Sequence, residues 1–273
     1  MQKIKIILKE LINYILNFLG LIVISKKFYT TSIANSNIAC QLNAIKFINK
    51  EENIKNFLKY LDKSTSQKKR VAMDLFVLQF LDFKKNGFFI EYGAGNGILN
   101  SNTYLMEKEF GWKGILSEPA NIYYPQLENN RKCFIDKNCV WSSSDKELTL
   151  IEAPKEIDSG MSSISEFAFD DRFSKIRSRG TKYKVNSITL EKLLDKYNAP
   201  KVIDYISIDT EGSEYETLKN FNFEKYSFRF ITCEHMYVQN KRDKILKLLN
   251  SQGYDRICEN ISGQDDWFVM KSN

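Results

Sequence analysis

The sequence predicts an α/β fold of Rossmann-like type, in which a doubly wound, mostly parallel sheet carries helices on both faces. From residue 87 onward, short apolar runs alternate with segments of helical period. Such alternation is typical of strands joined by crossover helices. The length of 273 residues suits one such domain plus an appendage. The apolar share of 43% and the charged share of 27% are those of an ordinary globular protein.

Residues 1–65 are predicted to form an N-terminal helical extension that precedes a main domain over residues 66–273. Within the extension, residues 11–25 carry no charge and follow a lysine-rich start. This run is shorter than the ~20 apolar residues of a membrane span, and Asn13 and Asn17 interrupt it. We therefore expect a helix that packs on the domain or mediates self-association, with peripheral contact to a membrane as the alternative.

The cysteine content favours neither a zinc cage nor a disulfide framework, because the five cysteines are odd in number and form no C-x-x-C pair. A chain of this kind suits a reducing cytoplasm, at the inner face of the membrane if the N-terminal segment attaches there. The net charge of +6 is a modest excess that favours anionic ligands without requiring nucleic acid.

The main domain is expected to begin with a helix within residues 66–85, because apolar residues recur there at helical spacing from Met73 to Phe80. Strands are then predicted at residues 88–92, 114–117, 139–141, 202–208, 228–233, 254–259 and 267–271. Helices are predicted at residues 104–110, 190–197, 214–221 and 242–251. Ser213 and Glu216 form a capping-box pattern, which predicts a helix start directly after residue 212.

Residues 154–184 do not fit this alternation, since they are polar and show no clear period. Loops of this length in compact domains are often functional, so a substrate lid is predicted there, with a plain insertion as the alternative. Within the lid, Arg172 and Tyr183 are candidate substrate contacts. Basic side chains of this kind suit a sugar that carries a nucleotide diphosphate.

A glycine-rich turn follows the first predicted strand, with Gly93, Gly95 and Gly97 in a G-x-G-x-G pattern. Missing side chains let a ligand lie against the backbone. The third glycine of the dinucleotide pattern is absent, because Ile98 stands at its position. Glu91 precedes the turn, where a carboxylate disfavours a pyrophosphate but suits the cationic methionine end of S-adenosylmethionine.

Glu118 ends the second predicted strand and is the candidate ribose ligand. It lies about 20 residues beyond the glycine turn, the spacing at which an acid in nucleotide-binding α/β folds accepts the ribose hydroxyls. The order of strand, glycines and acid predicts a nucleoside cofactor. Glu91 and the missing glycine favour S-adenosylmethionine over a nicotinamide dinucleotide, so a nicotinamide-dependent oxidoreductase is the weaker alternative.

Several segments together resemble the FkbM family of S-adenosylmethionine-dependent methyltransferases, and the likeness runs from about Asp82 to the C-terminus. The segments that carry it are residues 89–102, 111–119, 130–131, 187–190 and 208–214. The resemblance implies a fold of the class I methyltransferase type and O-methylation, often of sugar hydroxyls in polysaccharides, glycolipids or natural products. It also implies cofactor contacts for Ser101 and Asn102, for which helix capping is the alternative.

Candidate catalytic residues follow two later strands, because ligands of open α/β sheets bind beyond the carboxyl ends of the strands. Asp209 and Glu211 follow the strand at 202–208, and Glu234 and His235 follow the strand at 228–233. His235 is the only histidine of the chain, and a neutral imidazole can take the proton that a hydroxyl loses on methylation.

Asp209 is the second candidate base, and it could instead orient His235. Asp209, Glu234 and His235 could also bind Mg²⁺ or Mn²⁺, since hard oxygen ligands with one imidazole suit these ions. Glu211 is a candidate substrate contact, with service to the positive end of the following helix as the alternative.

Two alternatives to a sugar O-methyltransferase are a nucleic-acid methyltransferase and a protein without catalytic activity. A nucleic-acid methyltransferase is disfavoured, because base N-methylating families carry a Pro-Pro-aromatic motif where this chain has residues 209–212, and no aromatic and basic stripe suits stacked bases. A non-catalytic glycan-binding scaffold would leave the glycine turn without a ligand. The resemblance therefore implies O-methylation of a sugar hydroxyl, in a nucleotide-activated sugar or a surface polysaccharide precursor, and we expect no nucleic-acid partner.

Overall fold

The computed structural model describes residues 51–66, 72–154, 160–169, 172–259 and 262–271. The predicted helix at residues 11–25 lies outside this part of the chain and stays a prediction. Among the described residues, no helix has the length and apolar character needed to cross a membrane.

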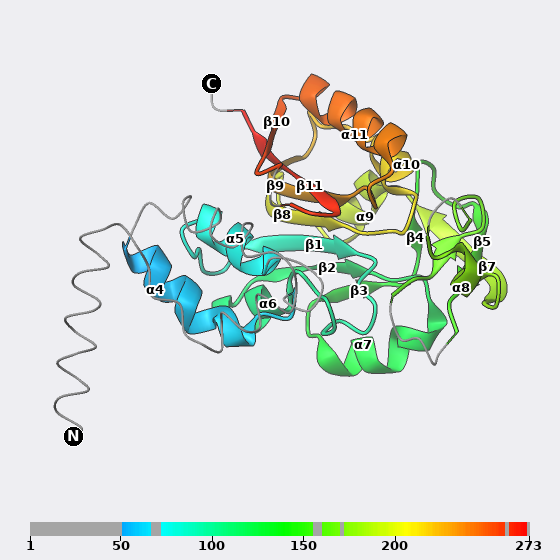
Figure 1. Cartoon of the computed structure of the whole chain (residues 1–273), viewed down its shortest axis with the longest axis horizontal. Helices are drawn as coiled ribbons and strands as arrows, with labels where there is room; N and C mark the ends of the chain where they lie inside the picture. The colour runs from blue at the N-terminus through cyan, green and yellow to red at the C-terminus, as the bar shows by residue number, and fades with distance from the viewer. Residues whose placement is uncertain (1–50, 67–71, 155–159, 170–171, 260–261, 272–273) are drawn as a thin grey trace.

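A seven-stranded sheet forms the centre of the fold, with strand order β10-β11-β9-β8-β1-β2-β3 (Figure 1). Its strands are β1 (Phe88–Tyr92), β2 (Lys113–Ser117), β3 (Phe134–Asp136), β8 (Val202–Ile208), β9 (Ser227–Glu234), β10 (Tyr254–Ile257) and β11 (Asp265–Met270). The five strands from β3 to β9 pair in parallel. β11 is antiparallel to β9, and β10 is antiparallel to β11. The predicted mostly parallel sheet is confirmed.

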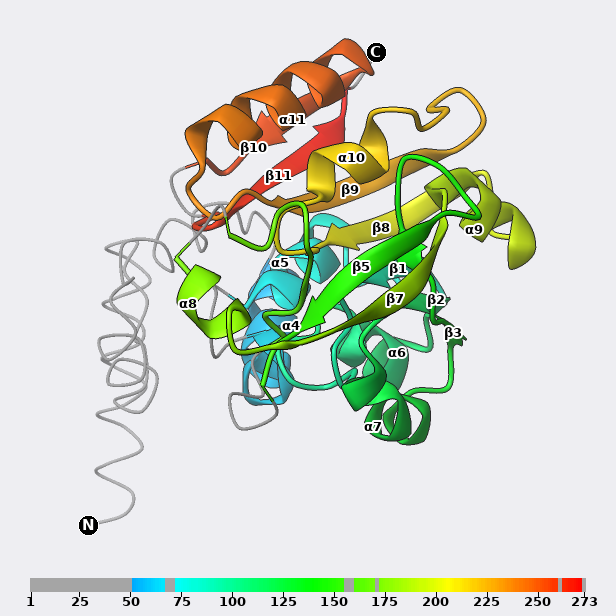
Figure 2. The same ribbon diagram turned by 90° about the vertical axis from the view of Figure 1, so that its right-hand side faces the viewer.

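Helices cover both faces of this sheet, as Figures 1 and 2 show. On one face lie α9 (Leu190–Lys196), α10 (Glu214–Leu218) and α11 (Gln239–Ser251). On the other lie α4 (Glu51–Tyr60), α5 (Met73–Phe80), α6 (Tyr104–Phe110) and α7 (Tyr124–Asn130). A short 3₁₀ turn, Asn121–Tyr123, leads into α7.

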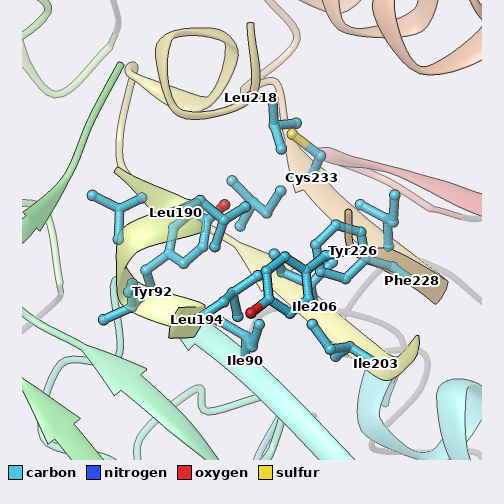
Figure 3. Close-up of a cluster of buried hydrophobic side chains, with 14 of the residues drawn as sticks. Ile90, Tyr92, Leu190, Leu194, Ile203, Ile206, Leu218, Tyr226, Phe228 and Cys233 are labelled. Atoms are coloured by element: carbon cyan, nitrogen blue, oxygen red, sulfur yellow. The ribbon is translucent and has the colours of Figure 1, made fainter. Parts of the chain in front are cut away.

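Strand alternation divides the apolar residues between these two faces. On β1, Phe89 packs under α5 and α6, whereas Ile90 packs under α9. On β8, Tyr205 and Ile206 divide in the same way, as expected for side chains that alternate across a strand. Figure 3 shows the second cluster, in which Ile90 and Ile206 of the sheet lie near Leu194 of α9. All of these side chains have no exposed surface, so the central strands are fixed from both sides.

The described end of the predicted N-terminal extension belongs to the main core. The ring of Phe57 on α4 lies 5.7 Å from that of Phe76 on α5, and Tyr60 lies 4.8 Å from Phe110 on α6. The helix predicted within residues 66–85 is α5, whose bounds are those of the apolar pattern, and Asp82 adopts a positive φ of 51° just beyond it.

A second sheet has the strand order β4-β7-β5-β6. Its strands are β4 (Cys139–Val140), β5 (Glu147–Glu152), β6 (Ser163–Ile164) and β7 (Thr181–Ile188), and α8 (Ser174–Arg177) lies between the last two along the chain. In Figure 1, β5, β7 and α8 lie on the side toward which the β1 arrow points. The second sheet therefore stands beside the carboxyl end of β1.

The lid prediction for residues 154–184 needs a correction, since this stretch is not one irregular loop. It contains β6, α8 and the first half of β7. Its strands were missed because β6 has two residues and β7 places charged side chains at exposed positions, so tertiary pairing with β5 outweighs local pattern. The strand predicted at 139–141 likewise belongs to this second sheet, as β4, whereas the three-residue β3 forms the edge of the main sheet.

Candidate active site

The glycine turn, residues 93–97, connects β1 to the following loop in a conformation that needs glycine. Gly93, Gly95 and Gly97 have φ values of 77°, 52° and 80°, which side chains disfavour. A Cβ atom at Gly93 would overlap the carbonyl oxygen of Asp209, and one at Gly97 would press on Arg131. At Gly95 a Cβ atom would meet nothing within 4 Å. The turn is thus closed toward the protein and open above Gly95.

Glu91 fastens the glycine turn to the start of α6. Its carboxylate accepts hydrogen bonds from the Ser101 hydroxyl at 2.8 Å, the Asn102 backbone N–H at 2.7 Å and the Thr103 hydroxyl at 2.5 Å. Ser101 Oγ in turn accepts from the Tyr104 N–H at 3.1 Å. Ser101 thus binds the first N–H of α6, whose N-cap residue is Thr103, and it also lies in the wall of a cavity.

Arg131 holds the glycine turn and the start of α6 together, and the sequence did not predict it as a site residue. Its buried guanidinium donates to the Gly97 carbonyl at 3.0 Å and to Ser101 Oγ at 3.1 Å, and it pairs with Glu107 at 2.8 Å. It also lies 3.8 Å from Glu91. The one sequence feature that pointed to this arginine is its place in residues 130–131, a segment that resembles the FkbM family.

Glu118 at the end of β2 faces the glycine turn. One carboxylate oxygen accepts from the Gly95 N–H at 2.7 Å, and the other accepts from the Ala120 N–H at 2.8 Å. Burial raises the pKa of this carboxyl to about 7, and the nearby Glu152 and Asp209 carboxylates act in the same direction. Near neutral pH, Glu118 is thus close to the midpoint of its titration.

Three carboxylates meet where β8 and β9 end. Asp209, Glu211 and Glu234 each offer one oxygen, and these oxygens lie within 4.8 Å of one another. We call these residues the acid cluster. Arg177 of α8, which is fully buried, donates to Glu211 at 2.7 Å. One of the three negative charges is therefore paired by the second sheet's helix.

Glu214 holds the turn that carries two members of the acid cluster. Its buried carboxylate accepts from the backbone N–H groups of Thr210 at 3.2 Å and Gly212 at 3.0 Å. The predicted start of α10 directly after residue 212 is confirmed, but the predicted capping box is wrong. The Ser213 hydroxyl donates to Thr210 Oγ1, and the Ser213 side chain caps no N–H of the helix.

A cavity of about 220 Å³ lies between the glycine turn and the acid cluster. On the side of β1 its wall includes Glu91, Gly93, Gly95, Ser101 and Asn102. On the opposite side it includes Asp209, Glu211, Glu234, Met236 and Gln264, together with Arg172 and Phe173 from the segment before α8. The cavity therefore joins most of the residues that the sequence marked for a cofactor, without Gly97 and Glu118, to the three acids at the ends of β8 and β9.

Two predicted substrate contacts have different places. Arg172 lines the cavity and donates to Gln264 at 2.6 Å. Tyr183 on β7 is not part of the cavity wall. Its hydroxyl donates to Glu152 at 2.5 Å and accepts from the Asn121 N–H at 2.8 Å, so it joins the second sheet to the segment after β2.

His235 does not join the acid cluster, although Glu234 beside it does. Its ring is buried outside the cavity wall. Nδ1 accepts the Tyr237 N–H at 3.0 Å, and Nε2 lies 3.8 Å from Asp266. In the described part of the chain, the group that could hold a metal ion is thus Asp209, Glu211 and Glu234, with Glu211 in place of the predicted His235.

The family follows from a comparison of the sequence with family models. The model of the methyltransferase FkbM domain matches residues 91–256, more than half of the chain. The chain belongs to the FkbM methyltransferase family. It is therefore an S-adenosylmethionine-dependent methyltransferase with a Rossmann-like α/β fold, as the sequence predicted. No curated protein matches the chain.

Solved structures similar to this FkbM protein are methyltransferases with low sequence identity. The precorrin-6y C5,15-methyltransferase from Geobacter metallireducens GS-15 is 11% identical over 72% of this chain and 85% of that chain, with a TM-score of 0.37. The N-terminal domain of human METTL16 in complex with SAH is 14% identical over 73% of this chain and 69% of that chain, with a TM-score of 0.33. TM-scores below 0.5 do not bear on the acceptor of this protein.

The cavity fits the methyl donor of the family. The backbone above Gly95 is open, so a ligand can lie against it. Asn102 is 3% exposed, its Nδ2 donates to Ser207, and its Oδ1 has no hydrogen-bond partner among the described residues. A buried acceptor of this kind suits an ammonium or hydroxyl donor.

Proposed function

We propose that this FkbM protein transfers a methyl group from S-adenosylmethionine to a sugar hydroxyl, in a nucleotide-activated sugar or a surface polysaccharide precursor. The observation that carries the proposal is the acid cluster in the wall of the cavity that also contains the glycine turn. A hydroxyl must lose its proton on methylation, and a carboxylate within hydrogen-bond reach can accept it. Neighbouring carboxylates can bind the adjacent hydroxyls of a sugar.

The proposed cofactor contacts come from residues at and after the ends of β1 and β2. S-adenosylmethionine supplies an electrophilic methyl group on a positively charged sulfur. Glu118 would accept the ribose hydroxyls, and Asn102 Oδ1 would accept from the ammonium group. Glu91 and Ser101 hold the loop beside the glycine turn, so that backbone can approach the cofactor.

Asp209 is the proposed general base. Among the three acids it is the half-exposed one, whereas Glu211 and Glu234 are buried, and Glu211 is neutralised by Arg177. Glu211 would then position an acceptor hydroxyl. Arg172 at the rim suits a phosphate of a nucleotide sugar, because a guanidinium binds phosphate oxygens with two donors.

A divalent cation at the acid cluster is the second candidate, and the grouping of three carboxylates is the observation that favours it. Oxygen ligands of this type suit Mg²⁺ or Mn²⁺. The cation would lower the pKa of an acceptor hydroxyl. Exhaustive chelation with EDTA tests this candidate: abolished turnover that returns with Mg²⁺ supports a cation, and full turnover leaves the proton with Asp209.

The proposed acceptor is tested by incubating the protein with methyl-labelled S-adenosylmethionine and a panel of nucleotide sugars. We expect label in at least one sugar, at a hydroxyl position. A short RNA serves as the competing acceptor, and label in RNA but in no sugar would reject the proposal. Thermal shifts with S-adenosylhomocysteine and with NADH check the cofactor separately, and stabilisation by NADH alone would favour an oxidoreductase.

Attachment to a membrane, or self-association, through residues 11–25 remains a prediction from the sequence. It can be tested by sedimentation of the full chain with and without anionic phospholipid vesicles.

A further inference from the structure

The turn after β9, residues 234–238, has a strained backbone beside the cavity. Met236 and Tyr237 have φ values of 50° and 59°. Two consecutive non-glycine residues in this region persist only when their surroundings hold them there. Met236 is 9% exposed and lines the cavity, two residues after Glu234 of the acid cluster. The conformation of this turn therefore sets part of the cavity wall.

His235 holds the turn through both its backbone and its ring. Its backbone N–H donates to the Gln264 carbonyl at 2.8 Å, and its carbonyl accepts from the Val238 N–H at 2.8 Å. Its ring atom Nδ1 accepts from the Tyr237 N–H at 3.0 Å. A side-chain acceptor that binds the N–H two residues ahead is the pattern of an Asx-turn, here formed by an imidazole.

Neither ring nitrogen is placed to take a proton from an acceptor. In a neutral imidazole whose Nδ1 accepts a hydrogen bond, the proton is on Nε2. Nε2 lies 3.8 Å from Asp266 Oδ1, and Arg242 binds both oxygens of Asp266, at 2.8 and 2.7 Å. The ring is 1% exposed and outside the cavity wall.

We infer that His235 is a positioning residue for methyl transfer and not the base: its Nδ1 closes the turn that places Glu234 in the acid cluster and Met236 in the cavity wall. The inference rests on the proposed function in one respect, the placement of the acceptor at the acid cluster. It explains why the single histidine lies at the active edge of the sheet with its ring directed away from the cavity.

Three substitutions of His235 distinguish a hydrogen-bond acceptor within the turn from a general base. The amide of His235→Asn reaches the place of Nδ1 and can accept from the Tyr237 N–H, whereas the amide of His235→Gln reaches the place of Nε2. We expect His235→Asn to keep most of the turnover. We expect His235→Gln and His235→Ala to lower kcat/KM for the acceptor about 100-fold, the scale of a small misplacement of catalytic groups. The dissociation constant of S-adenosylhomocysteine should stay unchanged in all three variants.

A base predicts another pattern, because none of the three replacements carries a basic nitrogen. Equal loss of turnover in His235→Asn and His235→Gln, with both variants folded, would overturn the inference, and full turnover in His235→Gln would do the same. Thermal unfolding of each variant identifies any loss that arises from an unfolded chain.

The tautomer of the His235 ring can also be measured without a methyl acceptor, since the chain has a single histidine. Nitrogen-15 NMR of the imidazole should show one spin system in the neutral state at pH 7, with the proton on Nε2 and Nδ1 unprotonated. A proton on Nδ1 would overturn the inference. If no sugar is methylated but the tautomer is as expected, the proposed acceptor fails and the turn assignment stands.

Discussion

Acids lie at two sides of the cavity, and the protein holds them differently at each. The first half of the site is formed by the ends of β1 and β2, where Glu118 binds the Gly95 N–H from outside the cavity wall, and the second half by the ends of β8 and β9. At the ends of β1 and β2, the carboxylates of Glu91 and Glu118 accept hydrogen bonds from nearby N–H and hydroxyl groups. At the ends of β8 and β9, three carboxylates lie within 4.8 Å of one another. Crowded like charges cost free energy and are typical of functional sites. In the proposed function, the first half is the frame that holds the cofactor, and the second half takes the proton of the acceptor.

The largest expected effect is that of Asp209→Asn. Removing a general base lowers turnover by about 1000-fold, while the affinity for S-adenosylhomocysteine stays the same because the frame is intact. Labelled-methyl transfer and calorimetric titration measure the two quantities. Asp255→Asn, at an exposed position of β10, is the matched control and should change neither. A parallel loss of ligand affinity in Asp209→Asn would break the division between the halves.

The next effect concerns Gly95, where a side chain would project into open space. Gly95→Ala should fold, with about 1 kcal/mol of backbone strain at a φ of 52°, and should lower the affinity for S-adenosylhomocysteine about tenfold or more because the methyl group enters cofactor space. Gly253→Ala is the control, since Gly253 also has a positive φ and open space but lies outside the cavity. Equal affinities in the two variants would contradict the placement of the cofactor.

A smaller, pH-dependent effect is expected for Glu118. Its ionised form offers more acceptor positions to the ribose than its protonated form, and burial places its pKa at about 7. The affinity of the wild type for S-adenosylhomocysteine should therefore rise as the pH increases from 6 to 8. In Glu118→Gln the affinity should be lower and independent of pH over this range. A pH-dependent affinity that persists in the glutamine variant would assign the titration to another group.

The same pKa makes a prediction about stability. The pKa of Glu118 is raised in the folded state from 4.5 to about 7, so the folded state binds a proton that the unfolded state has lost in this window. The stabilisation is fully present below pH 4.5 and is lost as the pH rises through 7. Glu118→Gln should become more stable relative to the wild type between these values, by up to about 3 kcal/mol. Urea unfolding at pH 5 and pH 8 measures the difference.

The smallest effects distinguish two residues that the sequence marked as substrate contacts. Tyr183→Phe removes a hydroxyl that bridges Glu152 and Asn121, so it should cost about 1 kcal/mol of stability and leave the acceptor KM unchanged. Arg172→Ala alters the cavity rim and should raise the acceptor KM with no change in stability. A raised KM in the tyrosine variant would extend the acceptor site to the second sheet.

Much of the frame could be predicted from the sequence. The strands β1 and β8 are mainly apolar because both faces of the sheet are covered, and their predicted bounds are those observed. The glycine-rich turn was predicted after β1, and it occurs there at Gly93, Gly95 and Gly97. These features are local, so a single sequence shows them.

The second half of the site, at the ends of β8 and β9, depends on contacts between residues far apart in the chain. No local sequence pattern indicates such contacts. Arg177 reaches Glu211 from a helix 34 positions away along the chain, and Glu211 itself has a positive φ of 54°. His235 was expected to face the cavity from its position at a strand end, but the turn at Met236 directs its ring elsewhere. Side-chain direction at a strand end is set by the following turn, and these turns use non-glycine residues with positive φ.

The most direct test of the division between the halves is a crystal structure of the protein with S-adenosylhomocysteine. We predict that the ligand lies over the glycine turn, with its ribose hydroxyls on Glu118 and its sulfur facing the acid cluster. A ligand bound outside this cavity, or one whose sulfur faces away from Asp209, Glu211 and Glu234, would contradict the account.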